Sequence, residues 1–123
     1  MKFSIVIPIF NEKKNISELV FQIKKNLSKY KYEIIIVDDS SNDGSKRILD
    51  SLTNKYKNLK VIFRNNLPRD LSKSCRDGFE KSKYENIIVM DGDLQHNPIY
   101  IPKMIEIFEK KKNDFVIGIR DLK

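Results

Sequence analysis

Residues 33–41 read Glu33-Ile34-Ile35-Ile36-Val37-Asp38-Asp39-Ser40-Ser41, so a short apolar run ends abruptly in carboxylates and hydroxyls. An uninterrupted apolar run of this length is typical of a strand in a parallel sheet, because helices cover both faces of such a sheet. The polar cluster that follows is typical of a turn and the start of a helix. The stretch therefore predicts a buried strand over 33–37 that leads through a turn into a helix.

The same alternation extends along the whole chain. Further apolar runs predict strands over 3–7, 59–63, 86–90 and 115–119. Between them, apolar residues recur at helical spacing, which predicts helices over 15–29, around 48–56, around 71–79, and up to 108 from a start near Pro98 or Pro102. We expect Pro8 to close the first strand, because proline cannot continue a central strand. We expect Cys75 to lie in the core on the third helix, between Leu71 and Phe79.

Four strand–helix units followed by a strand predict an α/β fold, a mainly parallel sheet flanked by helices. A chain of 123 residues suits a single domain spanning 1–123. Only four residues follow the last expected strand, and no helix closes it. Because a parallel sheet needs both faces covered, we expect the domain to be truncated, with its remainder beyond Lys123.

The composition excludes several classes of protein. No apolar run approaches the roughly 18–20 residues of a membrane span, and the N-terminus lacks the features of a signal peptide. A single cysteine excludes an internal disulfide and a multi-cysteine metal site. The four glycines do not fit the dinucleotide-binding or P-loop motifs. The net charge of +7 is compatible with phosphate-bearing partners, but the lysines are spread along the chain as on a solvated surface.

Polar residues gather just after the expected strands, where an open parallel sheet binds its ligands. They are Pro8, Asn11, Glu12, Asp38, Asp39, Asp91, Asp93, Gln95 and Arg120. Five carboxylates on one edge repel one another, and a divalent cation would relieve this. Asp91 and Asp93 flank only Gly92, so both can approach one ion, and oxygen ligands favour Mg²⁺ or Mn²⁺ over zinc. We expect Gly92 to let the backbone come close to a ligand.

Each motif also has a structural explanation. Asp38 and Asp39 are of the type that caps a helix, and Asn11 with Glu12 suits the start of the first helix. A lone Asp-x-Asp is common, and His96 suits a turn. These explanations do not account for polar groups at successive strand ends.

Three segments together resemble a known family. They are Ile5-Val6-Ile7-Pro8-Ile9-Phe10-Asn11-Glu12, Ile36-Val37-Asp38-Asp39-Ser40-Ser41 and Val89-Met90-Asp91-Gly92-Asp93-Leu94-Gln95-His96. They resemble the inverting family 2 glycosyltransferases of the Rossmann-like GT-A fold, in particular the polyprenyl-phosphate (dolichyl-phosphate) mannosyl- and glucosyltransferases. Ile117-Gly118-Ile119-Arg120 is similar to a later element of that branch.

The resemblance implies roles for single residues. Those holding the nucleotide base and ribose would be Pro8, Phe10, Glu12, Val37 and Asp39, with Asn11 and Asp38 beside them. Asp91, Gly92, Asp93 and Gln95 would hold the metal and diphosphate, the metal ligands being Asp91, Asp93 and Gln95. Arg120 would contact phosphate and act with Asp91 and Asp93 in catalysis. Phe10 replaces a usual tyrosine, and Gly92 replaces a usual alanine, which we expect to be a mild change.

The resemblance implies an enzyme that moves mannose or glucose from GDP-mannose or UDP-glucose to a polyprenyl phosphate, with Mg²⁺ or Mn²⁺. It implies a cytoplasmic protein, peripheral at the cytoplasmic face of a membrane, acting with a partner chain or a missing C-terminal part. Two alternatives stay open: a nucleotide-sugar-binding fragment without catalysis, and a family 2 transferase to a sugar hydroxyl. A nucleic-acid-binding domain is a third hypothesis, and the acidic edge argues against it.

Overall fold

The computed structural model describes residues 1–65, 67–94 and 97–111. In chain order the elements are β1 (Lys2–Ile9), α1 (Ile16–Asn26), β2 (Lys31–Asp38), α2 (Ser45–Lys55), β3 (Leu59–Phe63), α3 (Leu71–Lys81), β4 (Asn86–Val89), the 3₁₀ helix η1 (Pro98–Tyr100) and α4 (Ile101–Lys111). The four strands form one sheet in the order β3-β2-β1-β4, and every pair is parallel. The prediction of a parallel α/β sheet is therefore confirmed. The strand expected over 115–119 lies outside the described residues.

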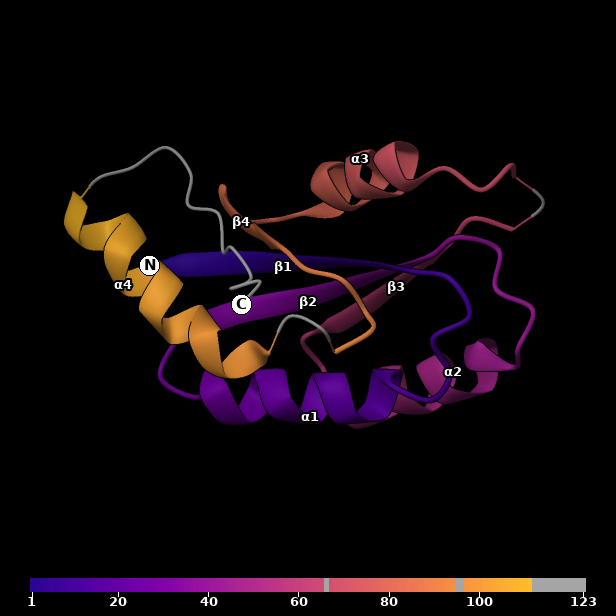
Figure 1. The fold of residues 1–123 in the computed structure, drawn as a ribbon, viewed down its shortest axis with the longest axis horizontal. Helices are drawn as coiled ribbons and strands as arrows, with labels where there is room; N and C mark the ends of the chain where they lie inside the picture. The colour runs from indigo at the N-terminus through magenta and orange to yellow at the C-terminus, as the bar shows by residue number, and fades with distance from the viewer. Residues whose placement is uncertain (66, 95–96, 112–123) are drawn as a thin grey trace, which may run out of the picture.

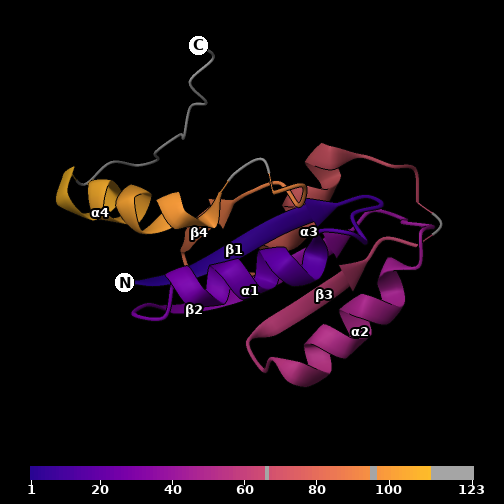
Figure 2. The ribbon, with the colours of Figure 1, turned by 60° about the horizontal axis from the view of Figure 1, so that its bottom comes forward.

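Helices cover the two faces of the sheet (Figure 1). On one face, α1 and α2 lie side by side (Figure 2), and on the other α3 crosses β1 and β2. η1 packs against α1 and leads into α4. The helix predicted over 15–29 is shorter, since α1 ends at Asn26 with the amide of Leu27 bonded to the carbonyl of Ile23.

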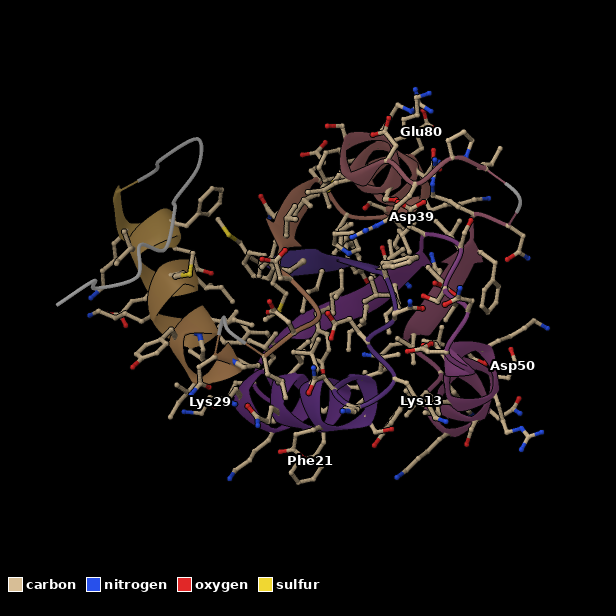
Figure 3. The ribbon with its side chains drawn as sticks, turned by 45° about the vertical axis from the view of Figure 1, so that its right-hand side comes forward. Lys13, Phe21, Lys29, Asp39, Asp50 and Glu80 are labelled. Carbon is tan, nitrogen blue, oxygen red and sulfur yellow. The ribbon has the colours of Figure 1, made fainter. Side chains whose placement is uncertain are left out.

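Alternate residues of β1 enter two separate cores. Ile5 and Ile7 join the larger cluster, which α1, α2 and α4 complete, whereas Val6 joins Ile35 and Val37 in a smaller cluster on the α3 side. Both faces of the central strands are thus buried, which is why their sequences are almost continuously apolar. On α1 the outward-facing Phe21 stays exposed and points away from the sheet (Figure 3).

The expectation that Pro8 closes the first strand is wrong, because β1 continues to Ile9 in the middle of the sheet. Backbone groups of a strand between two partners point alternately to each partner. The carbonyl of Val6 accepts the Met90 amide on the β4 side, and that of Ile9 accepts the Asp39 amide on the β2 side. The nitrogen of Pro8 therefore faces the β4 side, where the β1–β4 pairing has already ended at Val6. The missing amide hydrogen of Pro8 therefore affects only the β4 side of β1 and leaves the pairing with β2 intact.

The buried face of α3 also differs from the expected one. Leu71 is 64% exposed and Phe79 43% exposed, and Cys75 is only half-buried rather than in the core. Ser74 and Gly78 face the sheet instead. A methyl group on Gly78 would lie 2.4 Å from Cγ1 of Val6, so the small residues are what allow α3 to approach the sheet so closely.

Among the helices that the structure describes, none combines the length and the apolar character that a membrane crossing requires.

Candidate functional site

A cavity of about 290 Å³ opens at the carboxyl edge of the sheet, where β1, β2 and β4 end and α3 begins. Four segments that are far apart in the sequence meet there. The cavity is lined by Pro8, Ile9, Phe10, Glu12, Asp39, Arg69, Leu71, Ser74, Asp91, Gly92 and Asp93. Seven of the residues expected at a ligand site therefore share one cavity, and Asp39 lies on the same side of the molecule as the Asp91–Asp93 pair.

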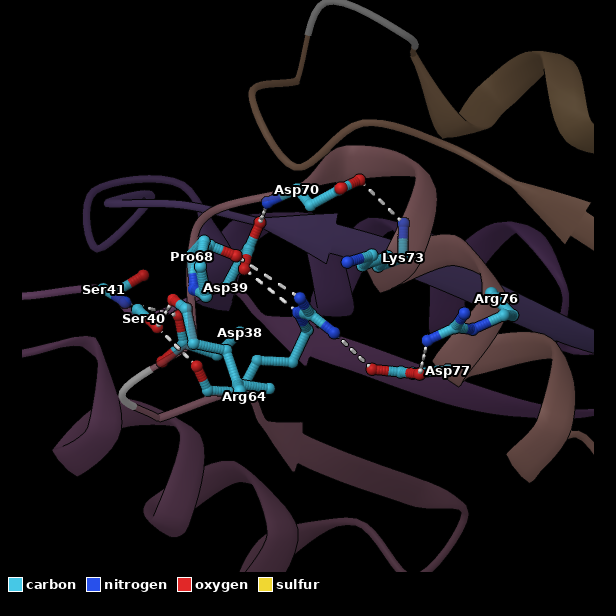
Figure 4. Close-up of polar contacts among 11 residues, drawn as sticks. Asp38, Asp39, Ser40, Ser41, Arg64, Pro68, Asp70, Lys73, Arg76 and Asp77 are labelled. Carbon is cyan, nitrogen blue, oxygen red and sulfur yellow. Dashed lines mark hydrogen bonds and ion pairs between the residues drawn. The ribbon is translucent and has the colours of Figure 1, made fainter.

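Asp39 is held in place by a buried network at the end of β2 (Figure 4). Nε of Arg64 donates to Oδ1 of Asp39 over 3.1 Å, and the amide of Asp70 donates to Oδ2 over 2.7 Å. Arg64 also donates through Nη1 to Asp77 over 2.6 Å. Its bonds to Asp77 and Asp39 raise the pKa of Arg64 above its ordinary value. A permanent positive charge thus pairs with Asp39 and, together with the Asp70 amide, holds both of its carboxylate oxygens in place.

Arg69 and Phe10 stack across the cavity. The guanidinium carbon of Arg69 lies 4.0 Å from the centre of the Phe10 ring, a cation–π contact. Phe10 comes from the end of β1, and Arg69 from the loop before α3. The pair therefore joins two of the loops that form the cavity, and it brings a cation to an otherwise acidic wall.

Asp91 and Asp93 follow β4 and supply the carboxylates on the third side of the cavity. Burial raises the pKa of the Cys75 thiol, and the negative charge of Asp91 raises it further. Within the described residues, no cluster of three His, Cys, Asp or Glu side chains could hold a metal ion. Two carboxylates nevertheless fit Mg²⁺ or Mn²⁺, because such an ion commonly takes one or two carboxylates and completes its shell with phosphate oxygens and water.

Gly92 lies against the end of β1, where there is no room for a larger side chain. A methyl group there would lie 2.6 Å from Cγ2 of Ile9 and 3.5 Å from Cγ of Glu12. Alanine at this position of the chain would therefore force Ile9 to move. The close approach sets where the backbone between Asp91 and Asp93 runs relative to the end of β1.

Three of the expected ligand residues do not line the cavity. Asp38 is buried, and its Oδ1 accepts the Ser41 amide over 3.1 Å, as a turn-capping aspartate does. Val37 is buried in the core beneath α3. Asn11 has φ 53° and accepts the amide of Asn42 at Oδ1 over 2.9 Å, so it connects the loops after β1 and β2.

Glu12 has a structural role at the start of α1 and also lies in the wall of the cavity. Its carbonyl accepts the amides of Asn15 and Ile16 at the start of α1, and its carboxylate accepts the Asn15 side-chain amide over 2.9 Å. It also lines the cavity. Gln95, His96 and Arg120 lie outside the described residues.

Sequence reasoning missed Arg64, Arg69 and Ser74. Arg64 directly follows the apolar run 59–63, so the search for polar groups after strands could have found it. Arg69 and Ser74 belong to the approach and first turns of α3. Their position follows from α3 running back from the carboxyl edge, which no local pattern indicates.

Comparisons with known proteins agree on one family. The model of "Glycosyl transferase family 2" matches residues 4–123. The chain is 41% identical over 123 residues to a dolichol-phosphate mannosyltransferase of Pyrococcus furiosus, which covers all of this chain and 34% of the relative.

Two solved structures show the same fold. S. aureus TarS 1-349 in complex with UDP-GlcNAc has a TM-score of 0.75 at 23% identity, over 98% of this chain and 37% of that one. Mannosyltransferase PcManGT from Pyrobaculum calidifontis, in complex with GDP-Man and Mn²⁺, has a TM-score of 0.73 at 17% identity, over 86% of this chain and 32% of that one. The chain thus spans about a third of the length of these proteins.

Proposed function

The chain belongs to glycosyl transferase family 2, and from that premise we propose that its cavity binds a nucleotide-sugar donor for transfer of mannose or glucose to a polyprenyl phosphate. One observation carries the proposal. Asp39 and the Asp91–Asp93 pair come from separate loops and line a single cavity together with Phe10 and Arg69. Such a cavity offers a ring face, a cation and carboxylates to one ligand.

The nucleoside occupies the side of the cavity formed by β1, β2 and the start of α3. The carboxylate of Asp39 keeps lone pairs beyond those used by Arg64 and Asp70, and it can accept N–H or O–H groups of a nucleoside. The ring of Phe10, with the Arg69 guanidinium stacked on one of its faces, supplies apolar surface. Pro8 and Glu12 complete this side of the cavity.

The diphosphate occupies the side formed by Asp91 and Asp93. These carboxylates would hold Mg²⁺ or Mn²⁺, and Gln95 and Arg120 are proposed to assist them. When bound, the ion would supply Lewis-acid stabilisation of the negative charge on the departing nucleoside diphosphate. The close approach of Gly92 to Ile9 would fix the backbone between Asp91 and Asp93 relative to the end of β1.

The reaction is a displacement at the anomeric carbon of the sugar, with inversion. A polyprenyl phosphate is already ionised near neutral pH, so its oxygen needs no strong general base. The acceptor would come from a membrane surface, and a partner chain or a further C-terminal part would supply its binding site. We therefore place the protein at the cytoplasmic face of a membrane.

Titration calorimetry tests the donor site directly. We expect the chain to bind GDP-mannose or UDP-glucose in Mn²⁺ and to lose that binding in EDTA. Asp91→Asn and Asp93→Asn should abolish the metal-dependent binding while circular dichroism shows an unchanged fold. Asp50→Asn, on the exposed surface of α2, is the matched control. Unchanged affinity in both cavity variants would overturn the assignment.

A second candidate function follows from the share of the relatives that the chain spans. A third of a transferase could bind the donor without completing the transfer. Incubation with labelled donor and polyprenyl phosphate separates the two functions, because the transferase produces labelled lipid whereas the binding module produces none and still binds the donor.

A further inference from the structure

Ser74 is a polar residue of the cavity to which the proposed function gives no role. It lies on the first turns of α3, its side chain is 0% exposed, and it belongs to the cavity wall. Within the described ranges, its Oγ has no hydrogen-bond partner. Burying a hydroxyl without a partner is unfavourable, since the group loses its bonds to water.

Packing alone does not explain a serine at this position. Gly78, one turn later on the same buried face, lets α3 lie against Val6 and Val37. Alanine would provide the same small volume without a buried hydroxyl and with a better helix propensity. We therefore expect the hydroxyl to form a hydrogen bond with a ligand bound in the cavity.

The contacts around Asp39 and Ser74 indicate which part of a ligand the Ser74 hydroxyl would bond. The amide of Asp70 donates to Asp39 over 2.7 Å, and the carbonyl of Asp70 accepts the Ser74 amide over 3.0 Å. Asp70 thus bonds the side chain of Asp39 and the backbone of Ser74, and both Asp39 and Ser74 line the cavity. Asp39 offers a hydrogen-bond acceptor there, and Ser74 offers a hydroxyl that can donate.

We propose that Ser74 is a specificity-determining residue of the donor site, whose hydroxyl donates to a carbonyl oxygen of the nucleobase while Asp39 accepts the neighbouring ring N–H. An acceptor beside a donor matches a ring N–H next to a C=O, which uracil and guanine carry. Cytosine and adenine present an unprotonated ring nitrogen beside an amino group, so in the same orientation the Asp39 carboxylate would face a nitrogen that has no hydrogen to donate. The inference rests on the proposed function, since it assumes a nucleotide in this cavity.

The test measures binding of UDP, GDP, CDP and ADP by calorimetry in Mn²⁺. We expect the protein to bind UDP or GDP at least about tenfold more tightly than CDP and ADP, because mispaired buried groups are strongly unfavourable. Ser74→Ala should weaken binding of the preferred nucleotide about threefold to tenfold, as the loss of one hydrogen bond does, and leave CDP and ADP unchanged. Ser72→Ala, on the exposed surface of α3, should change none of these affinities.

A stability measurement distinguishes this role from a structural one. Removing an unpartnered buried hydroxyl should leave the melting temperature of the free protein unchanged or higher, whereas a hydroxyl that supports the fold would lower it on removal. If Ser74→Ala binds all four nucleotides as the parent protein does, or loses affinity for all four equally, the inference is wrong and the donor site stands. If the parent protein binds no nucleotide at all, both proposals fail.

Discussion

Arg64 and Asp39 form a buried ion pair at the base of the cavity, with Nε 3.1 Å from Oδ1 and the two side chains 4% and 6% exposed. Arg64 reaches a second carboxylate, Asp77 on α3, over 2.6 Å. One cation thus joins the loop after β3 to the end of β2 and to α3. Of the two groups that bond the Asp39 carboxylate, the Asp70 amide and the Arg64 side chain, only Arg64 carries a charge.

Arg64→Met should therefore strongly destabilise the protein. Methionine keeps most of the aliphatic volume but leaves the buried carboxylate of Asp39 without its cation, a change that costs about 3–5 kcal/mol at buried pairs. Urea unfolding followed by circular dichroism measures the loss. Arg76→Ala is the control, because Arg76 also pairs with Asp77 but is 60% exposed and should cost about 1 kcal/mol or less. Equal losses in the two variants would contradict the structural importance of the buried pair.

The environment of Glu33 predicts that the free energy of unfolding depends on pH. It is 1% exposed in β2 and accepts hydrogen bonds from Ser4 Oγ over 2.5 Å and the Lys83 amide over 2.7 Å, with Lys60 Nζ at 2.8 Å. Burial alone would raise the pKa of Glu33, but the bonds from Lys60, Ser4 and Lys83 outweigh it, and the pKa lies below its ordinary value of 4.5.

The unfolded chain therefore binds a proton at Glu33 more readily than the folded one. The stabilisation is complete above pH 4.5 and is lost as the pH falls through the lower folded pKa. We expect the difference in unfolding free energy between the parent protein and Glu33→Gln to be largest near neutral pH and to shrink in acid. Glu85→Gln, at an exposed position, serves as the control. A difference for Glu33→Gln that stays constant with pH would contradict the prediction.

The strands could be predicted from sequence because their signal is local. Ile34, Ile35 and Ile36 are apolar whichever face of the sheet they occupy. A buried parallel strand can therefore be recognised from its sequence without knowing which elements pack against it. The convergence of Asp39 with Asp91 followed in turn from the general rule that parallel strands end at one edge. These predictions needed only the order of the elements.

The errors concern residues whose role depends on a neighbour. Pro8 is tolerated within β1 because its nitrogen faces β4, at the end of the β1–β4 pairing, and not β2, and Gly78 matters because Val6 lies beneath it. On α3, the larger side chains Leu71 and Phe79 were expected to be buried, but the helix approaches the sheet through its smallest ones. No periodicity reveals such a preference, because it depends on the distance between two elements.

Gly92→Ala should destabilise the protein through its contact with Ile9. The added methyl group would lie 2.6 Å from Cγ2 of Ile9, and relieving such an overlap costs about 1–3 kcal/mol. A double-mutant cycle in urea tests the cause, because Ile9→Ala removes the atom that is too close. We expect Gly92→Ala to cost less in the Ile9→Ala background, with a coupling of about 0.5 kcal/mol or more. Additive losses would show that Ile9 is not the source of the strain.

Arg69→Ala should weaken nucleotide binding without destabilising the fold. Within the described part of the chain, Arg69 is the only cationic residue that lines the cavity, and its side chain lies on the Phe10 ring at the surface. A hydrogen bond to a charged group contributes about 1.5–3 kcal/mol, so we expect the affinity for GDP or UDP in Mn²⁺ to fall at least about tenfold in calorimetry.

The variant Arg69→Lys distinguishes the contribution of the positive charge to nucleotide binding from that of the planar guanidinium. Lysine keeps the positive charge but lacks the planar group that stacks on Phe10, so it should restore part of the affinity and not all of it. Arg47→Ala, at an exposed position on α2, removes the same charge far from the cavity and should leave binding unchanged. If Arg69→Ala binds GDP and UDP as tightly as the parent protein does, the guanidinium does not contact the donor, and its stacking on Phe10 serves only to join the two loops.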